Sequence, residues 1–413
     1  MDLAPRLDVA RVRQDFPILS STVRGRPLVF LDSGASAQKP RAVIEAMTRF
    51  METSYANVHR GAYRLSEMAT EAYEAARGAV QGFLGAARPE EIVFTRNATE
   101  AFNLVAHGFG RHLLKPGQVV LVSEMEHHAN LVPWQMLRDA GHGIGLRFIR
   151  VTDAGELDLE DLARHLAQGD VGLVSVTHMS NVLGTVTPAA AIARMAHEAG
   201  ARVMFDGSQA AVHRAVDVRA IGADFYAFTG HKLYGPTGIG VLYARHELLE
   251  AMPPFLGGGD MIETVTLERS TWAAPPARFE AGTPAITEAV GLHAAIDYVN
   301  ALGMEAIEAH ERALVEHASA TLARVDGVTL LGRAQDRGGV FAFSLEGVHP
   351  HDLATFLDRR GICVRAGRHC AEPLHARFGL DGGTARASFG LYTTPGEIDA
   401  LAEALGAARG FFA

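Results

Sequence analysis

Cysteine is scarce in this sequence. The 413 residues include only two cysteines, Cys363 and Cys370, at a spacing that matches no local metal site. A disulfide framework is therefore excluded, and we expect a reducing, cytoplasmic environment. No uncharged apolar run reaches about 18 residues, which excludes a transmembrane helix. Residues 1–8 mix acidic with apolar side chains, so we expect no signal peptide.

Positive charge is in deficit. Lysine and arginine total 38 against 47 acidic residues, which gives a formal net charge of −9. With no long basic run, the chain is a poor candidate for binding nucleic acid or an anionic membrane surface. Glycine, by contrast, is abundant at 43 residues. We expect part of this excess to serve tight turns near a ligand.

Short apolar runs alternate with longer segments of helical period. This alternation is typical of an α/β protein with a mostly parallel sheet. The predicted strands are residues 91–95, 118–123, 146–151, 171–177, 202–206, 224–229 and 238–243. Amphipathic helices are predicted between several of them, for example over residues 99–109 and 188–199.

The pattern changes in the last third of the chain. Two long helical stretches, residues 286–308 and 311–325, precede a shorter strand–helix–strand region. We therefore predict a large domain over residues 21–295 and a smaller α+β domain made of residues 1–20 and 296–413.

Polar residues end several of the predicted strands, namely Thr95, Ser123, Thr177, Asp206 and Thr229. In open α/β sheets, ligands bind beyond the carboxyl ends of the strands. We therefore expect these side chains to meet at one pocket.

Two charged residues follow predicted strands. Lys232 comes directly after one of them, in a glycine-rich segment. It could line the pocket or be a surface lysine in a turn. Asp206 ends an apolar run, where a carboxylate is costly to bury unless it faces a cation. Its alternative role is to cap the helix that follows.

Two further segments could complete a site. His127 and His128 are neighbours, and neighbouring side chains of an extended segment point in opposite directions, so we expect one of them to face the pocket. Residues 95–100 open a helix, whose free N–H groups could bind a phosphate. The alternative is a simple helix start with Thr99 as part of its cap.

One cofactor explains these features together. Pyridoxal phosphate needs a lysine for covalent attachment, a carboxylate for its pyridine nitrogen and a phosphate-binding turn. The carboxylate keeps the ring nitrogen protonated, so that the ring can accept electrons.

The motifs of the chain resemble those of a known family. They are Leu31-Asp-Ser-Gly-Ala-Ser-Ala-Gln-Lys-Pro, Asn57-Val-His-Arg-Gly, Met125-Glu-His-His-Ala-Asn-Leu-Val-Pro-Trp, Thr177-His-Met-Ser-Asn-Val-Leu-Gly-Thr, Thr229-Gly-His-Lys, Arg278-Phe-Glu-Ala-Gly-Thr-Pro and Arg365-Ala-Gly-Arg-His-Cys-Ala. In this order they resemble the SUF-type (group II) cysteine desulfurases of the class-V aminotransferase family. These are fold-type-I pyridoxal-phosphate enzymes, so the resemblance implies a seven-stranded, mostly parallel sheet and a smaller C-terminal α+β domain.

The resemblance also implies an activity. The chain would convert L-cysteine to L-alanine and transfer the sulfur to Cys370 as a persulfide, for iron–sulfur cluster assembly. It would act as a homodimer and pass the sulfur to a separate SUF-type acceptor protein, whose identity the sequence does not reveal.

The resemblance assigns roles to individual residues. Lys232 would hold the cofactor, Asp206 would pair with its ring nitrogen, His127 would stack on the ring and Gln209 would bond its phenolic oxygen. The phosphate contacts would be Ala98, Thr99, Thr229 and His231, with Thr283 reaching the phosphate of the neighbouring subunit. The substrate carboxylate would be bound by Asn181 and Arg386, with Arg365 and His59 in the same pocket. No metal is implied.

The two cysteines lie in different surroundings. Cys363 belongs to an apolar run and is expected in the core. Cys370 lies in a polar loop with Arg365, Arg368 and His369, where positive neighbours favour the reactive thiolate. We therefore expect Cys370 to be the nucleophile.

The chain departs from the family pattern at three places, the smallest being Ser208 in place of the common alanine between Asp206 and Gln209. Arg368 stands where these enzymes commonly have a histidine, and a permanent cation cannot shuttle a proton near neutral pH. Asn97 and Ala98 replace the glycine and threonine that often begin the phosphate turn. Asparagine tolerates left-handed backbone angles, so we expect the turn to form with one hydroxyl group fewer for the phosphate.

Three alternatives remain open at this point. The nearest is a selenocysteine lyase or another class-V lyase, such as a kynureninase-like enzyme, which would share Lys232 and Asp206. The second is a non-catalytic scaffold of the same fold. The third is a zinc site built from His127, His128, His369 and Cys370.

Overall fold

The computed structural model describes residues 7–412, and its centre is a seven-stranded sheet. The strands are β4 (Ile92–Thr95), β5 (Val119–Ser123), β6 (Gly145–Ile149), β7 (Val171–Thr177), β8 (Arg202–Asp206), β9 (Phe225–Thr229) and β10 (Gly240–Ala244). Their order is β4-β10-β9-β8-β7-β5-β6, and only β10 runs antiparallel to its neighbours. The predicted fold class and all seven predicted strands are confirmed.

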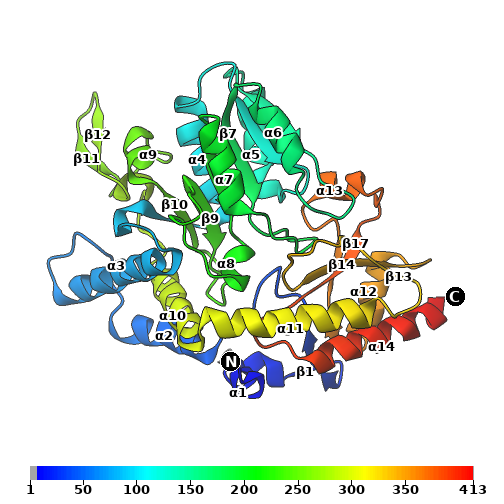
Figure 1. The fold of residues 1–413 in the computed structure, drawn as a ribbon. Helices are drawn as coiled ribbons and strands as arrows, with labels where there is room; N and C mark the ends of the chain where they lie inside the picture. Colours follow the sequence, from blue (N-terminus) through cyan, green and yellow to red (C-terminus); the bar gives the residue numbers. More distant parts are fainter. Residues whose placement is uncertain (1–6, 413) are drawn as a thin grey trace, which may run out of the picture.

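Helices cover both faces of this sheet (Figure 1). They are α3 (Arg64–Leu84), α4 (Ala98–Val105), α5 (Val132–Asp139), α6 (Leu159–Leu166), α7 (Ala189–Glu198), α8 (Ala210–His213) and α9 (His246–Ala251). In β8, Val203 and Phe205 join the core under α6 and α7, while Met204 joins the core under α4 and α5. A strand covered on both faces needs apolar residues at every position, which is why these strands read as continuous apolar runs.

A second, antiparallel sheet contains β13 (Val328–Leu330), β14 (Val340–Leu345), β17 (Thr384–Ser388) and β16 (Arg365–Gly367), in that order. The helices around it are α11 (Met304–Leu322), α12 (Pro350–Asp358), α13 (Glu372–Arg377) and α14 (Pro395–Phe412). Beside it, β15 (Ile362–Cys363) pairs with β3 (Val29–Phe30) in parallel. The N-terminal segment therefore packs against the C-terminal part of the chain.

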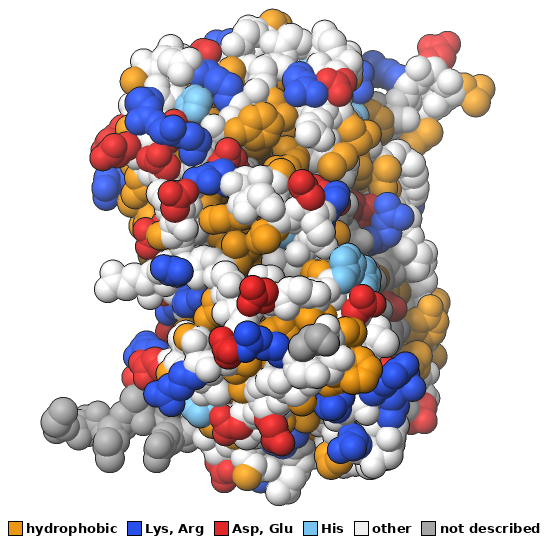
Figure 2. Space-filling view, turned by 90° about the vertical axis from the view of Figure 1, so that its right-hand side faces the viewer, with side chains coloured by type: hydrophobic (Ala, Val, Ile, Leu, Met, Phe, Trp, Pro, Cys, Tyr) orange, Lys and Arg blue, Asp and Glu red, His pale blue; other side chains and the backbone are white. Residues whose placement is uncertain are grey.

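The remaining elements are α1 (Val9–Gln14), α2 (Arg41–Thr53), α10 (Ile286–Leu302) and two hairpins, β1 (Thr22–Val23) with β2 (Arg26–Pro27) and β11 (Ile262–Val265) with β12 (Ser270–Trp272). Within residues 7–412, no helix combines the length and hydropathy that a membrane span requires. On the face drawn in Figure 2, cationic and anionic side chains are interspersed.

The break between the two long helices differs from the prediction. The sequence pattern placed it near residues 309–310, but α10 ends and α11 begins at Gly303, whose φ is +83°. Glycine adopts this angle without a steric penalty, and that local preference ends the helix although the apolar pattern continues. The predicted boundary between residues 295 and 296 lies inside α10. The division into two domains stays a prediction, and its residues 1–6 lie outside the described part.

A buried ion pair joins α3 to the sheet and to the segment before α10. The guanidinium of Arg77 donates to both carboxylate oxygens of Glu280, at 2.7 and 2.9 Å. The same carboxylate accepts from the Tyr73 hydroxyl at 2.8 Å and from the Phe94 backbone N–H at 2.7 Å. Only 3% of the Arg77 side chain and 7% of the Glu280 side chain are exposed, so neither charge has water as a substitute partner.

The substitution Glu280→Gln should therefore destabilise the protein by about 3 kcal/mol, since it removes the buried carboxylate partner of Arg77 and leaves that guanidinium only the more exposed carboxylate of Glu74. The midpoint of chemical denaturation measures the effect. Glu67→Gln serves as the control, because Glu67 pairs with Arg64 in an exposed ion pair that is expected to contribute little. Equal midpoints for the two variants would contradict the role given to Glu280.

Candidate active site

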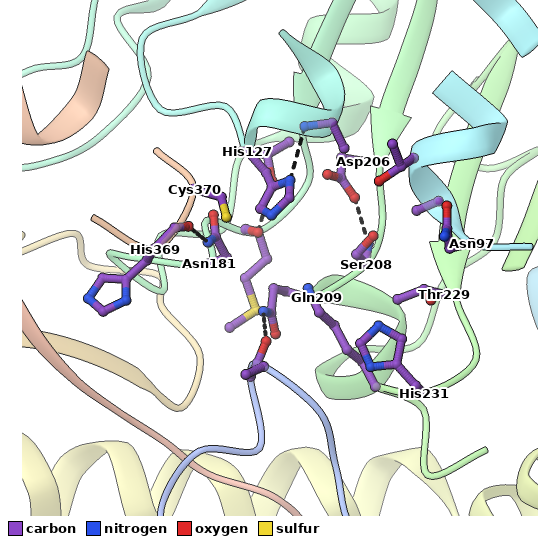
Figure 3. Close-up of a pocket in the computed structure, with 18 of the residues that line it drawn as sticks. Asn97, His127, Asn181, Asp206, Ser208, Gln209, Thr229, His231, His369 and Cys370 are labelled. Atoms are coloured by element: carbon purple, nitrogen blue, oxygen red, sulfur yellow. Dashed lines mark hydrogen bonds between the residues drawn. The ribbon is translucent and has the colours of Figure 1, made fainter. Parts of the chain in front are cut away.

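A cavity of about 470 Å³ lies beyond the ends of β7, β8 and β9 (Figure 3). Of the five polar strand ends expected to meet there, Thr177, Asp206 and Thr229 line it, and Thr95 and Ser123 do not. Twelve of the predicted site residues line it: Ala98, Thr99, His127, Asn181, Asp206, Gln209, Thr229, His231, Lys232, Arg365, Cys370 and Arg386. They come from both the large sheet and the C-terminal part of the chain.

Lys232 and Asp206 share this cavity. Burial lowers the pKa of Lys232 to about 8, and the opposite charge of Asp206 limits that decrease. Asp206 is buried, and its Oδ1 accepts the backbone N–H of Ser208 at 2.9 Å. The next helix, α8, has Gln209 at its N-cap, so Asp206 does not cap it. The alternatives of a surface lysine and a helix cap are therefore wrong.

His127 faces the cavity, while His128 points away from it and pairs with Glu372. The Nδ1 atom of His127 accepts the backbone N–H of Ala129 at 3.0 Å, which assigns the ring proton to Nε2. Burial, with help from the charge of Lys232, lowers the pKa of His127 to about 4. His127 is thus a neutral, fixed ring at neutral pH.

The turn at the start of α4 closes one end of the cavity. Asn97 is its N-cap, and its side chain accepts the backbone N–H of Glu100 at 2.9 Å. The backbone of Asn97 is extended, with φ at −173°, so the expected left-handed turn is wrong, as is the alternative of Thr99 as cap. Gly240 lets β10 pass close by, because a Cβ there would lie 2.4 Å from the carbonyl carbon of Asn97.

The donor set of the cavity fits pyridoxal phosphate. The hydroxyl oxygen of Thr229 is buried without a partner, beside the first N–H groups of α4, which lack intrahelical acceptors. Both would suit a phosphate. The Gln209 amide donates to the Gly34 carbonyl at 2.7 Å, yet its Oε1 atom is buried and unpartnered. With Asp206 and Lys232 nearby, the pocket can satisfy a phosphate, a ring nitrogen and an aldehyde.

The opposite end of the cavity is cationic. Arg386 is buried on β17, and its Nη1 donates to the backbone carbonyl of Asn181 at 2.9 Å. Its Nε atom is buried and has no hydrogen-bond partner. Burial lowers the pKa of Arg386, and the nearby charge of Asp32 raises it. The Arg386 guanidinium can therefore donate hydrogen bonds to a carboxylate.

Cys370 is exposed at the cavity in a loop that is held at several points (Figure 3). His369 and Cys370 have φ angles of +51° and +54°, which side-chain-bearing residues rarely adopt. The carbonyl of His369 accepts the Asn181 amide at 2.8 Å, and that of Cys370 accepts the His128 N–H at 2.8 Å. The loop therefore presents the thiol in a fixed position.

Arg368, a residue of the same loop, anchors it to a neighbouring segment. Its guanidinium donates twice to the Asp381 backbone carbonyl, at 2.7 and 3.0 Å. The arginine that replaces the common histidine in this chain therefore fixes the loop to the backbone of Asp381. Cys363, by contrast, lies half-buried in β15, and burial raises its pKa.

Two predicted residues lie outside the cavity. His59 is exposed, and its ring lies 3.3 Å from the carboxylate of Glu74. Thr283 lines a separate cavity with Phe279 and Glu280. No group of three or more metal-type ligands occurs within residues 7–412, so the zinc alternative has no geometric support.

The sequence reasoning missed Asp32, whose carboxylate contacts both Arg365 and Arg386. It also missed Glu126, a buried carboxyl that accepts the Thr177 N–H at 3.0 Å and the Asn130 amide at 2.6 Å. Burial raises the pKa of Glu126 to about 8. Asp32 and Glu126 both lie within the motifs quoted above, and each directly follows an apolar residue. This position of a carboxylate next to apolar residues is the sequence feature that could have identified them.

Comparison with known proteins shows relatives that match nearly the whole chain. A cysteine desulfurase from Dickeya dadantii is 53% identical over 398 residues, which cover 96% of each chain. The crystal structure of the Escherichia coli cysteine desulfurase CsdA is 41% identical with a TM-score of 0.90, covering 98% of this chain and 100% of that one. The apo structure of a cysteine desulfurase from Thermococcus onnurineus is 40% identical with a TM-score of 0.91, covering 99% of each.

Residues 29–401 match the family described as aminotransferase class-V, whose members are pyridoxal-phosphate enzymes. The resemblance inferred from the motifs is confirmed at this level, and so are the predicted enzyme class and cofactor. The chain belongs to the class-V aminotransferase family.

Proposed function

We propose that this chain is a SUF-type cysteine desulfurase that releases L-alanine from L-cysteine and keeps the sulfur on Cys370 as a persulfide. The observation that carries the proposal is one cavity in which the thiol of Cys370, the amine of Lys232 and the guanidinium of Arg386 meet. These are the nucleophile, the base and the carboxylate anchor that the reaction requires.

The cofactor would be held at three places. Lys232 would bind its aldehyde carbon, Asp206 its ring nitrogen, and Thr229 with the start of α4 its phosphate. When bound, pyridoxal phosphate supplies an electron-accepting ring next to the substrate Cα. Asp206 would keep the proton on the ring nitrogen, because a buried carboxylate stabilises a neighbouring cation. His127, a neutral imidazole whose Nδ1 accepts the Ala129 N–H, would offer the cofactor ring an uncharged face.

The chain's own groups then act in order. Arg386 and Asn181 orient the substrate through its carboxylate, and the neutral amine of Lys232 accepts the proton from Cα. The Cys370 thiolate forms a bond to the substrate sulfur while the sulfur–carbon bond breaks. The electron pair of that bond stays with Cβ, which takes up a proton, and the ammonium of Lys232 returns its proton to Cα as alanine forms. The persulfide sulfur remains on Cys370.

Replacing Cys370 with alanine should abolish persulfide formation and lower alanine release from L-cysteine at least about a hundredfold, since no other described thiol lines the cavity. Mass analysis of the protein and an alanine assay measure the two effects. Cys363→Ala is the matched control and should keep both. Assays with L-selenocysteine test the lyase alternative, because selenium elimination does not strictly need a thiol. Undiminished cysteine turnover in Cys370→Ala would contradict the assignment.

The lowered pKa of Lys232 predicts how the apoprotein takes up its cofactor. Only the neutral amine attacks an aldehyde, and with a pKa of about 8 the neutral fraction is about one tenth at pH 7 and nearly complete at pH 9. Covalent attachment should therefore accelerate about tenfold over this range and level off above it, relative to a small-molecule amine. Stopped-flow absorbance measures the rate, and Lys232→Arg is the control. A rate that still rises steeply at pH 10 would show an ordinary lysine.

The SUF-type assignment rests on the motif resemblance and on the held loop of Cys370. A loop fixed by Asn181, His128 and Arg368 cannot carry the persulfide to a distant site. A separate acceptor protein must therefore reach into the cavity and take the sulfur. We place this transfer in the cytoplasm, as the supply of sulfur for iron–sulfur cluster assembly.

The homodimer would complete the phosphate site. Thr283 stands outside this chain's own cavity, in a segment that the Arg77–Glu280 ion pair holds in place. From there it can serve the neighbouring subunit, as the resemblance implies.

The protein should therefore have twice the 44.2 kDa mass of one chain in light scattering. Thr283→Val should weaken pyridoxal-phosphate binding about tenfold, the cost of one hydrogen bond to a charged group. Thr266→Val, in the exposed β11–β12 hairpin, is the control. A monomer that retains full cofactor affinity would contradict the role of Thr283.

A further inference from the structure

Lysine is rare in this chain, so the place of each lysine is informative. The 38 lysine and arginine residues include only three lysines, Lys39, Lys115 and Lys232. Lys115 is exposed, and Lys232 lines the cavity. Lys39 lies two residues before α2, outside the cavity lining, and the mechanism described above does not use it.

The ammonium of Lys39 donates to two backbone carbonyls. One belongs to Ala37, at 2.6 Å, and the other to His231, at 2.8 Å. The His231 carbonyl also accepts the backbone N–H of Ala37 at 3.1 Å and the hydroxyl of Ser36 at 3.4 Å. Three donors from one short segment therefore converge on the carbonyl that directly precedes the backbone nitrogen of Lys232.

The segment that carries these donors is itself fixed. The backbone N–H of Gly34 donates to the Ser388 hydroxyl at 2.8 Å, and the backbone N–H of Gln38 donates to the Tyr392 hydroxyl at 3.0 Å. Both hydroxyl groups belong to the C-terminal part of the chain. The donors of residues 36–39 are therefore held against the rest of the protein, and not only against the turn that they contact.

These contacts define the backbone from which the Lys232 side chain starts. The His231 carbonyl and the Lys232 nitrogen belong to one planar peptide unit, so fixing the oxygen also fixes the nitrogen. Burial lowers the pKa of Lys39 to about 8, and no carboxylate within residues 7–412 opposes that decrease. Burying such a cation is costly, and its recorded hydrogen bonds are to backbone carbonyls alone. An ammonium presents its donors from one nitrogen, whereas those of arginine lie in a planar fork, so the two are not interchangeable here.

We propose that Lys39 is a positioning residue for Lys232, because it holds the His231 carbonyl and thereby directs the Lys232 amine toward the aldehyde of pyridoxal phosphate. In this attachment the amine nitrogen forms a double bond to the aldehyde carbon. The aldehyde oxygen leaves as water with the two protons of the neutral amine. The inference rests on the proposed function, since it takes Lys232 as the residue that binds the cofactor.

The test measures the rate constant of covalent attachment in the apoprotein at saturating pyridoxal phosphate, by stopped-flow absorbance. Saturation separates attachment from binding, so the rate constant reports how well the amine is aligned with the aldehyde. Lys39→Met removes the donors and keeps an apolar chain, and it should lower this rate constant at least about tenfold at pH 7. The loss should persist at pH 9, where nearly all of the Lys232 amine is neutral, because its position has changed and not its protonation.

Two variants serve as controls. Lys115→Met removes an exposed lysine, and Ser36→Ala removes only the longest of the three contacts to the His231 carbonyl. Both should keep the rate constant within about twofold of the wild-type value. The thermal unfolding midpoint of each apoprotein separates a loss of alignment from a loss of fold.

A tenfold slower attachment in Lys39→Met, with an unfolding midpoint close to that of the wild type, supports the inference. An unchanged rate constant overturns it, as does a loss that only matches the fraction of unfolded protein. If Lys39→Met does not fold, Lys39→Gln decides, because it keeps an amide donor on a shorter side chain. That variant should attach the cofactor at least about threefold more slowly, and a wild-type rate there overturns the inference.

Failure of the proposed function is visible separately. Borohydride reduction of the wild-type holoenzyme, followed by peptide mass analysis, shows whether Lys232 carries the cofactor. Persulfide formation on Cys370 is measured in the same preparation. Attachment at Lys232 and a persulfide on Cys370, together with an unchanged rate in Lys39→Met, would overturn the role of Lys39 and leave the proposed function intact.

Discussion

The desolvation of one amine organises this structure. Lys232 follows β9 in a cavity where burial lowers its pKa and Asp206 opposes that effect. A buried ammonium is costly unless a partner compensates it, and a buried carboxylate has the same requirement. Each group therefore lowers the cost of burying the other. The surrounding neutral rings and orphaned acceptors are consistent with a site built for a polar, aromatic ligand.

The second constraint is the meeting of distant segments. The large sheet and the turns that follow its strands supply Asp206, Thr229 and Lys232, and the C-terminal part of the chain supplies Arg365, Cys370 and Arg386. Asp32 joins the N-terminal segment to this group through the bridge to Ser388. The arginines are thus fixed by ionic contacts before a substrate arrives, which lowers the entropy lost on binding. Such an arrangement favours a rigid site over one that closes around its ligand.

Much of this arrangement could be predicted from the sequence, for identifiable reasons. Strands buried on both faces read as apolar runs, and the polar residues that end them, such as Asp206 and Thr229, indicate the binding edge. Residues whose role depends on a distant partner could not be found in this way. Nothing local shows that Arg368 contacts the carbonyl of Asp381 or that Asp32 pairs with Arg365. The helix break at Gly303 was not predicted, because the apolar periodicity of the sequence continues across this single glycine.

The conformation of the Cys370 loop bears on how the sulfur leaves. Two successive left-handed residues cost about 1 kcal/mol each, and such strain persists only where surrounding contacts hold it. Here the loop is held by contacts with Asn181, His128 and Asp381, which lie in three different segments of the chain. Releasing the loop would break these contacts together, so movement of the persulfide by loop swinging is unfavourable. In the proposed function, the acceptor's own nucleophile would then have to reach Cys370 at the cavity, where the thiol is exposed.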